Sequence, residues 1–403
     1  MVRPLLLALL PALLFAQDFT QRGFLETTAQ IYPQAALNDS SHITAESLFR
    51  YEAFYKLTPG IRFAGAFDAR ADTHLETERA LGLSFWDRER RRPAFEIRRL
   101  SATYSRGKLT IEAGKQFIRW GKTDVLNPTD RFAPRDFVNV VDNDFLATTA
   151  GRLTYGDQSN TVDVVVSPRL TPSRVPLLNQ RWAVLPAGIP IAEQPPDFPG
   201  GPQFGARWNH IGRAAEYSLS FYNGYDHLPL YRAQLQLAPL SVEIQRFYPQ
   251  MRMYGADAAI PLAPVTLKAE AAYFTSTTPE SDQYVLYVVQ LERQAGEWSF
   301  VGGYAGQVIT KHGAALSYSP IRGSTRALVA RAGYTIDVNR NVALETVIRQ
   351  NGRGAYVKPE YTQAFGQHWR LTAGFVLIRG SDSDFLGQYH RNLHAILTVR
   401  YSF

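Results

Sequence analysis

The chain ends in NLHAILTVRYSF, residues 392–403. Along an extended strand every second side chain falls on the same face, and one face of this segment is apolar throughout: Leu393, Ala395, Leu397, Val399, Tyr401 and Phe403. The other face is polar except at Ile396, and it carries His394, Thr398, Arg400 and Ser402. Such alternation over about ten residues is typical of a strand that spans a membrane within a closed barrel.

Four earlier segments show the same alternation, at residues 43–57, 231–237, 342–349 and 369–377. A charge facing lipid at mid-membrane would cost up to about 2–4 kcal/mol, so we expect the charged face of each segment to line an aqueous lumen. The expected lumen-facing charges are Arg50, Lys56, Arg232, Lys268, Arg349, Arg370 and Arg400, partly offset by Glu46, Glu52, Glu270 and Glu345. With a formal net charge of +7, this set predicts a mild preference for anions.

The connectors between such segments fall into two classes. Short turns are expected at residues 58–60, 106–107, 156–160, 211–214, 238–239, 261–264, 294–297, 337–341 and 364–368, and longer loops at 33–42, 74–94, 119–148, 168–202, 309–323 and 380–388. Short periplasmic turns and long extracellular loops are typical of outer-membrane barrels. The pattern predicts an all-β, transmembrane antiparallel β-barrel of about 18 strands, within a range of about 16–20. Residues 161–167 and 241–248 are the weakest strand candidates.

The N-terminus has the features of an export signal. Arg3 precedes an apolar run from Pro4 to Ala16, which is the length of a secretory signal and too short for a membrane helix. We expect residues 1–16 to be a signal peptide cleaved before Gln17, and residues 17–403 to form a single barrel domain in the outer membrane of a Gram-negative-type bacterium. The chain has no Cys, which excludes disulfides and a thiolate nucleophile.

The stretch QFIRWGKTDVLNPTDRFAPRDF, residues 116–137, carries the densest group of charges. Residues 109–120 are expected to form a strand that leaves the membrane at Trp120. A phosphate-binding loop is excluded because Gln116 stands where the first glycine of that motif is required, and Asn127-Pro128 would break the following helix. A metal site is not indicated, since the three Asp residues are six positions apart and lie among Arg residues.

This stretch resembles a segment of porin-like outer-membrane families, including the alginate-export type. There a strand reading Gly-Arg/Lys-Gln precedes a Trp-Gly-x-x-Asp loop with a later Asn-Pro-x-Asp. The matching residues here are Gly114-Lys115-Gln116, Trp120-Gly121, Asp124 and Asn127-Pro128-Thr129-Asp130. The resemblance covers residues 114–136 and implies a barrel of roughly 18 strands that passes solute, such as an anionic saccharide or another organic compound.

Charged residues in two places are candidates for contact with a solute. They are Arg119, Lys122, Asp124, Asp130, Arg131, Arg135 and Asp136 in the loop, and Arg50, Glu52, Arg232, Glu345 and Arg349 on the wall. Guanidinium and carboxylate groups can bind solute through bidentate contacts, or they can hold a loop in one conformation. Residues 168–202 contain nine of the 24 prolines and form a loop that either enters the pore or covers its rim.

The sequence thus favours a porin-like channel for passive passage of small hydrophilic, including anionic, solutes. The alternatives are an adhesin or structural barrel without transport, and an outer-membrane hydrolase, for which no nucleophile motif is present. No cofactor, metal or nucleic acid is indicated. The expected partners are outer-membrane lipid and lipopolysaccharide, with residues 88–92 as a solvated basic rim. The barrel-assembly machinery is expected to bind the C-terminal strand, because a final aromatic at Phe403 resembles the sorting signal of outer-membrane proteins.

Overall fold

The computed structural model describes residues 18–184, 190–237, 240–350 and 353–403. The expected signal peptide and its cleavage point lie outside the described residues. Within the described ranges the only helices are two short 3-10 turns, η1 (Pro320–Ser324) and η2 (Gly387–Asn392). No helix in these ranges has the length and apolar content needed to cross a membrane.

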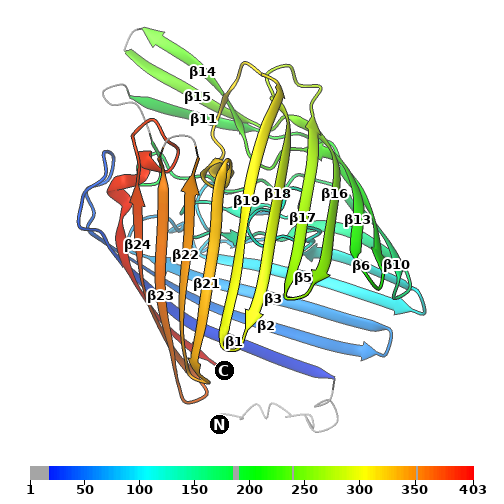
Figure 1. The fold of residues 1–403 in the computed structure, drawn as a ribbon. Helices are drawn as coiled ribbons and strands as arrows, with labels where there is room; N and C mark the ends of the chain where they lie inside the picture. Colours follow the sequence, from blue (N-terminus) through cyan, green and yellow to red (C-terminus); the bar gives the residue numbers. More distant parts are fainter. Residues whose placement is uncertain (1–17, 185–189, 238–239, 351–352) are drawn as a thin grey trace, which may run out of the picture.

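Antiparallel strands close into a barrel (Figure 1). The main sheet of the described residues has 19 strands, of which β4 (Leu83–Ser84) only adds a two-residue parallel bridge to β5, which leaves 18 in the wall. In chain order these are β1 (Phe19–Ile31), β2 (Ile43–Thr58), β3 (Ile61–Asp72), β5 (Phe95–Arg106), β6 (Leu109–Gln116), β9 (Thr148–Gly156), β10 (Asn160–Ser167), β12 (Gln203–Ile211), β13 (Glu216–Tyr225), β16 (Gln250–Leu262), β17 (Val265–Thr275), β18 (Gln283–Ala295), β19 (Trp298–Lys311), β21 (Ala327–Asp337), β22 (Arg340–Arg349), β23 (Ala355–Phe365), β24 (Trp369–Arg379) and β25 (His394–Ser402). The prediction of an all-β antiparallel barrel of about 18 strands is confirmed.

The first and last strands close the barrel. β1 pairs with β25 from Phe24 opposite Ser402 to Ile31 opposite Ala395. The backbones of Gly23 and Phe403 exchange two hydrogen bonds of 3.0 Å, and a Cβ at residue 23 would lie only 2.6 Å from the Phe403 ring. Gly23 therefore allows the terminal aromatic ring to cross the seam. Closure removes the unpaired strand edges that would otherwise be left without hydrogen bonds in lipid.

The period-two pattern of the last strand matches its environment. Leu397 is 46% exposed on the outer surface, whereas His394 is fully buried toward the interior. Ile396, the one apolar residue on the inner face, is also buried, because it packs in an apolar cluster inside the barrel that includes Trp182 and Tyr389. The exception in the sequence pattern thus marks a place where the interior is apolar.

The connectors segregate by length as expected. Eight of them have two to four residues and lie at one end of the barrel, together with the C-terminus (Figure 1). They coincide with all the predicted short turns except residues 238–239, which lie outside the described residues. The longer connectors lie at the opposite end, which we call the long-loop end.

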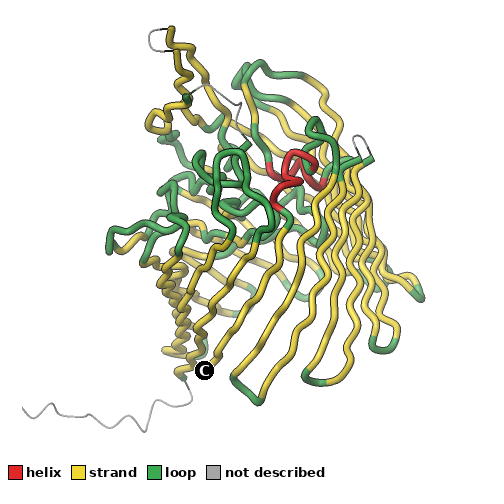
Figure 2. Tube along the Cα trace, turned by 90° about the vertical axis from the view of Figure 1, so that its left-hand side faces the viewer, coloured by secondary structure: helices red, strands yellow, loops and turns green. Residues whose placement is uncertain are grey.

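Residues 231–237 and 241–248 are not wall strands, and their assignment from alternation was wrong. They form most of β14 (Leu230–Leu237) and β15 (Leu240–Phe247), which build a second sheet with β11 (Ile191–Asp197) and β20 (Leu316–Ser317). This sheet stands above the long-loop end (Figure 2). The sequence of a hairpin with one apolar face and one polar face alternates like that of a membrane strand. Alternation alone therefore does not distinguish a hairpin outside the barrel from a strand of the wall. Arg232 accordingly lies outside the lumen.

Two connectors fold into the barrel. The Trp120 loop (residues 117–147) follows β6, and the first part of the Trp182 loop (residues 168–184) lies against it. Strand β6 ends at Gln116, so Trp120 is not at a membrane surface as predicted but is 2% exposed in the interior. The alternative in which the proline-rich segment enters the pore holds for residues 170–182, most of which are buried.

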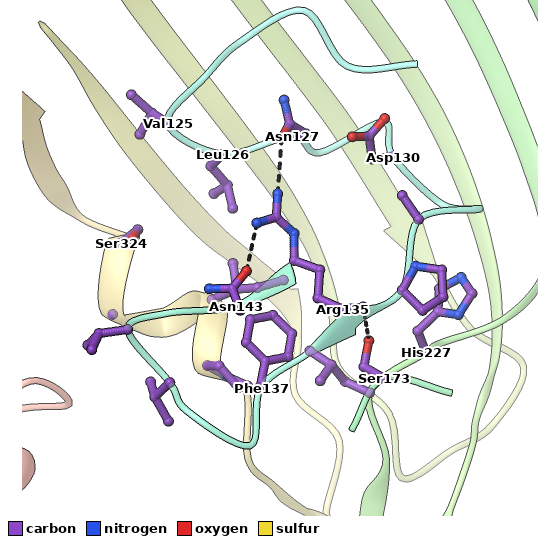
Figure 3. A pocket seen from close by; sticks show the side chains of 18 of the residues that line it. Val125, Leu126, Asn127, Asp130, Arg135, Phe137, Asn143, Ser173, His227 and Ser324 are labelled. Atoms are coloured by element: carbon purple, nitrogen blue, oxygen red, sulfur yellow. Dashed lines mark hydrogen bonds between the residues drawn. The ribbon is translucent and has the colours of Figure 1, made fainter. Parts of the chain in front are cut away.

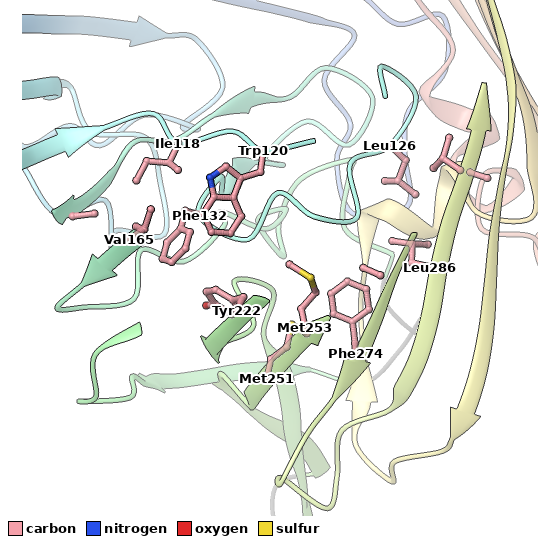
Figure 4. Packing of buried hydrophobic residues seen from close by; sticks show 14 residues of the cluster. Ile118, Trp120, Leu126, Phe132, Val165, Tyr222, Met251, Met253, Phe274 and Leu286 are labelled. Carbon is pink, nitrogen blue, oxygen red and sulfur yellow. The ribbon is translucent and has the colours of Figure 1, made fainter. Parts of the chain in front are cut away.

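The Trp120 loop packs on one side of the barrel through an apolar cluster (Figure 4). Trp120 and Phe132 meet edge to face at 5.5 Å, and Phe132 meets Tyr222 of β13 in the same way at 5.2 Å. Inward-facing Met253 and Phe274 complete the contact with the wall. The expectation of a polar interior throughout was therefore wrong, because this apolar core fills the interior beside β13 to β19 and the second cluster, around Trp182, lies beside β21 to β25.

Candidate functional site

Three adjoining cavities lie in the interior of the barrel. The upper cavity, about 260 Å³, lies between the Trp120 loop, η1 and the wall at β22 and β23. The middle cavity, about 390 Å³, shares Asn143 with it and is bounded by β1, β2 and β3. The lower cavity, about 670 Å³, shares Glu26 and Arg400 with the middle one and reaches the turn between β21 and β22. The three cavities thus extend from the long loops to the short-turn end, and their volumes increase in that direction.

Arg135 occupies the centre of the upper cavity (Figure 3). It lies in the two-residue strand β7 (Arg135–Asp136), which pairs with β8 (Asp144–Phe145) inside the Trp120 loop. Its guanidinium group donates to the side-chain oxygens of Asn143 at 2.8 Å and Asn127 at 3.3 Å, and it lies 4.1 Å from the Phe145 ring centroid. No carboxylate oxygen of the described residues lies within 4.0 Å of it.

Desolvation is the main influence on the charge of Arg135. Burial lowers the pKa of Arg135 to about 10, while Asp130 acts in the opposite direction. The side chain is therefore still a cation at neutral pH, and it is held by neutral amides rather than by an acid. A guanidinium group with this environment retains donors for a solute carboxylate.

Arg131 is a second cation of the upper cavity without an ion pair among the described residues. Its guanidinium group lies 5.0 Å from the Phe274 ring centroid and 3.9 Å from the sulfur of Met251. Two acids of the same cavity are paired, Asp124 with Lys268 at 3.3 Å and Asp130 with Arg119 at 3.3 Å. Two others, Asp226 and Glu345, form no ion pair among the described residues, although Glu345 lies opposite Arg331 and Lys358 in the strand register. The unpaired cations of this cavity therefore both lie on the Trp120 loop.

The middle cavity is lined by paired charges. Arg50 forms a bidentate pair with Asp68 at 2.7 and 2.8 Å, Arg70 contacts Glu46 at 2.7 Å, and Arg400 contacts Glu26 at 2.6 Å. Because these guanidinium groups already have acidic partners, they offer a solute fewer free donors than Arg131 and Arg135 do. Asp142 has no ion-pair partner among the described residues, which limits the positive character of this part of the passage.

Asp136 links three loops, and its carboxylate is bound by arginines rather than free to contact a solute. Its carboxylate accepts from Arg92 at 3.0 Å and from Arg174 at 3.0 Å, and Arg174 continues to Asp87 at 2.8 Å. Burial by itself would raise the pKa of Asp136, but Arg92 and Arg174 outweigh burial and hold it well below its ordinary range. The expectation that residues 88–92 form a solvated rim was wrong for Arg92, which is buried among acids, and Arg90 is engaged by Glu193 at 2.7 Å.

The motif at residues 114–130, which resembles a segment of porin-like families, shapes the start of the Trp120 loop. Gly114 has φ near +121°, and a Cβ there would lie 2.2 Å from the carbonyl oxygen of Leu100, so only glycine fits where the chain prepares to leave the wall. Gln116 donates to the Ala150 carbonyl at 2.9 Å. Asp130 accepts the backbone N–H groups of Trp120 at 2.5 Å and Gly121 at 2.7 Å. The motif therefore builds a loop that turns inward and holds itself together.

The structure separates the predicted site residues into two groups. Five line the upper cavity and two line the middle one: Asp124, Asp130, Arg131, Arg135 and Glu345, then Arg50 and Asp136. The other five act elsewhere: Arg119, Lys122, Glu52, Arg232 and Arg349. Lys122 is held by Glu216 at 2.9 Å and Asp257 at 3.2 Å, and Arg349 by Asp384 at 2.8 Å. For these two, the loop-locking role left open by the sequence is the observed one.

Several residues of the site had no signal in the sequence. Asn143 and Asn127 orient Arg135, and Ser173 accepts the backbone N–H of Arg135 at 2.9 Å. His227 contacts the carbonyl oxygens of Thr171 and Arg131, so it ties both inner loops to the connector that follows β13. Isolated polar residues in loops form no periodic pattern from which their role could be predicted. Across the described ranges, no group of three or more His, Asp or Glu side chains is arranged to hold a metal ion.

Solved structures with the same fold exist at low sequence identity. A BenF-like porin from Pseudomonas fluorescens Pf-5 superimposes with a TM-score of 0.56 at 10% identity, over 96% of this chain and 99% of that chain. OpdK, an outer-membrane protein of Pseudomonas aeruginosa, gives 0.56 at 9% identity, over 96% and 99%. Acinetobacter baumannii OccAB4 gives 0.55 at 11% identity, over 96% and 98%. No family model and no curated protein matches the chain. The chain therefore has the fold of an outer-membrane porin barrel along nearly its whole length.

Proposed function

We propose that the protein is a porin-like channel for the passive passage of small hydrophilic solutes across an outer membrane. The observation that carries this proposal is the series of three adjoining, charge-lined cavities that runs from the long loops to the short turns. A continuous polar route inside a barrel with an apolar exterior is what diffusion of a hydrated solute requires. No catalytic role is part of the proposal.

The apolar exterior supports a place in the outer membrane. Outward-facing residues such as Leu25, Leu219 and Leu344 are among the exposed large hydrophobic side chains. In water such a surface would favour aggregation, whereas in a bilayer it replaces lipid–lipid contacts. Lipid and lipopolysaccharide are the partners that we propose for this surface and for its rim at the long-loop end.

We further propose that Phe403 serves as the signal for barrel assembly. Its ring lies at the seam, near Phe49 at 6.1 Å, and its backbone closes the barrel through Gly23. Deleting Phe403 is expected to reduce the folded protein in the outer membrane severalfold, while a Phe403→Tyr variant keeps the terminal aromatic and should assemble normally. Heat-modifiable migration in gel electrophoresis of membrane fractions measures this, and equal assembly of the deletion and the Tyr variant would contradict the role.

Among hydrophilic solutes, we propose a mild preference for anions that carry a carboxylate. Arg131 and Arg135 are the cations of the upper cavity, and neither has an acidic partner in the described residues. A guanidinium group binds a carboxylate through two parallel hydrogen bonds, which a neutral solute cannot match. Asp142 and the paired acids of the middle cavity keep the preference mild.

Liposome swelling tests both the passage and the preference. Purified protein in liposomes is expected to admit neutral sugars, and to admit a singly charged sugar acid faster than an amino sugar of the same size. A short uronate oligosaccharide belongs in the panel because the alginate-export resemblance implies an anionic saccharide. Absence of swelling with every solute would favour a structural or adhesive barrel, and faster entry of the amino sugar would contradict the anion preference.

A further inference from the structure

Glu270 is a wall residue whose carboxylate is bound by the backbone of a loop. It lies on β17 and is 2% exposed. Its carboxylate accepts the backbone N–H groups of Lys122 at 3.1 Å, Thr123 at 3.3 Å and Thr129 at 2.7 Å. The hydroxyl groups of Thr123 and Thr129 add donors at 3.0 and 2.9 Å. No basic side chain of the described residues forms an ion pair with it.

Five donors around one carboxylate form an anion-binding nest. Converging backbone N–H groups favour negative charge, and hydrogen bonds to an ionised acceptor are about twice as strong as those between neutral groups. Within the Gly-Lys-Thr of this loop, Lys122 and Thr123 donate to an anion, as in part of a phosphate-binding loop. The anion is the protein's own Glu270, delivered by a strand more than a hundred residues away.

The neighbouring strand extends the attachment. Gln290 on β18 is fully buried, accepts the N–H of Asp124 at 2.9 Å, and donates to the carboxylate of Asp124 at 2.7 Å. The tip of the Trp120 loop, residues 122–129, is therefore bound to β17 and β18 by polar contacts. Leu126 packs beside these strands with Phe274 and Leu286 (Figure 4).

Asn127 connects this attachment to the passage. Its side-chain nitrogen donates to the carbonyl of Thr123, and its side-chain oxygen accepts from Arg135, as the dashed line in Figure 3 marks. Asn127 therefore lies between the two threonines that bind Glu270 and faces the cation of the upper cavity. We propose that Glu270 is a positioning residue that fixes the Trp120 loop and thereby holds Arg135 where it sets the charge preference of the channel. This inference rests on the proposed channel function.

The direction in which the anion-to-cation permeability ratio changes distinguishes a positioning role of Glu270 from the direct effect of its charge. Removing a lumen carboxylate should by itself raise the anion-to-cation permeability ratio. If Glu270 positions Arg135, its loss should instead lower that ratio, because the cation leaves its place in the passage. Reversal potentials in planar bilayers under a potassium chloride gradient measure the ratio directly.

Three variants make this test. Glu270→Gln keeps the shape but presents an NH₂ group to backbone donors, and Glu270→Asp keeps the charge but is one methylene shorter. We expect both to lower the anion-to-cation ratio by up to about 3-fold, the effect of losing one charge at about 6 Å in water. Glu360→Gln is the matched control, because Glu360 is a wall acid of the lower cavity whose partner is Lys358 at 3.3 Å. It should raise the ratio slightly or leave it unchanged.

Loop release is measured independently of conduction. Because the chain has no Cys, a single Val125→Cys substitution gives a unique thiol at the loop tip, where Val125 is half-buried against the apolar clusters. We expect a methanethiosulfonate reagent to label it at least about 10-fold faster when Glu270→Gln is added, since local opening exposes it. The pair Thr123→Val and Thr129→Val removes two donors from the loop side and should give an intermediate rate without altering the wall.

The outcomes separate the two proposals. A wild-type protein that does not conduct would reject the channel function, while the labelling rates would still report on the attachment of the loop. Unchanged labelling in folded Glu270→Gln would overturn the positioning role, as would a ratio that rises in Glu270→Gln and stays constant in Glu270→Asp. Heat-modifiable migration confirms that each variant forms the barrel.

Discussion

Arg135→Glu is expected to lower the anion-to-cation permeability ratio of the channel by about 10-fold. The substitution changes the charge of the upper cavity by two units beside the passage, and at about 6 Å in water this amounts to about 1.4 kcal/mol. Arg135 is held by Asn127 and Asn143 and has no acidic partner in the described residues, so no carboxylate loses its ion pair in the variant. Reversal potentials in planar bilayers provide the measurement.

Two controls accompany this prediction. Arg135→Gln changes the charge by one unit and should give about a 3-fold decrease on the same basis. Arg232→Glu makes the same two-unit change on β14, where Arg232 is half exposed and contacts Asp197 at 3.3 Å outside the lumen. Counter-ions screen a charge at that position, so the ratio should not change. A normal ratio in Arg135→Glu would place the selectivity of the channel elsewhere.

Asp136→Asn is expected to release the inner loops while leaving the barrel intact. The carboxylate of Asp136 is shared by Arg92 and Arg174, and removing one partner of a buried charge pair typically costs about 3–5 kcal/mol. The lower end of that range applies, because Arg92 keeps Glu46 and Glu76, and Arg174 keeps Asp87. An opening equilibrium changed by about 3 kcal/mol corresponds to a roughly 100-fold faster tryptic cleavage within residues 117–147 and 168–184.

Asp157→Asn is the matched control for this substitution. Asp157 is a fully exposed acid in the turn between β9 and β10, paired with Lys108 at 3.1 Å at the other end of the barrel. Cleavage of the inner loops should not change in this variant. Equal cleavage of Asp136→Asn and the wild type would show that the remaining acids hold the loops without Asp136.

Mild acid should not reproduce the effect of Asp136→Asn. Because the pKa of Asp136 is depressed in the folded state, its stabilising contribution is fully present above the unfolded pKa of about 4. The contribution is lost only as the pH falls through the lower, folded value. Tryptic fragments are therefore compared after incubation at pH 7 and pH 5, and the two patterns should agree for the wild-type protein.

The sequence predicted the wall of the barrel well, because the signal for a wall strand is local. Each strand meets apolar surroundings on one face and the interior on the other, so its own residues carry the period of two. The last strand shows this from Leu397 to Phe403, and its one irregular residue, Ile396, marks an apolar region of the interior. The same signal failed for residues 231–237, because a sheet outside the barrel can also have one apolar face.

The candidate site could be predicted only in part. The loop at residues 116–137 was identified by its density of charges, and Arg131 and Arg135 do line the upper cavity. The sequence did not show that Arg349 and Lys122 hold loops in place, since that depends on acids far along the chain, such as Asp384 and Asp257.

The sequence by itself determined the closed antiparallel barrel, the division into short turns and long loops, and the stretch that carries the site. The tertiary structure alone decided which loops fold inward, which arginines remain unpaired, and where the passage runs. The physical reason is the separation in sequence of the residues that interact. The alternating pattern of a strand depends on residues two positions apart, whereas Glu270 binds Thr129 across 141 positions of sequence. Contacts of that kind depend on the closed wall, which brings the two segments together.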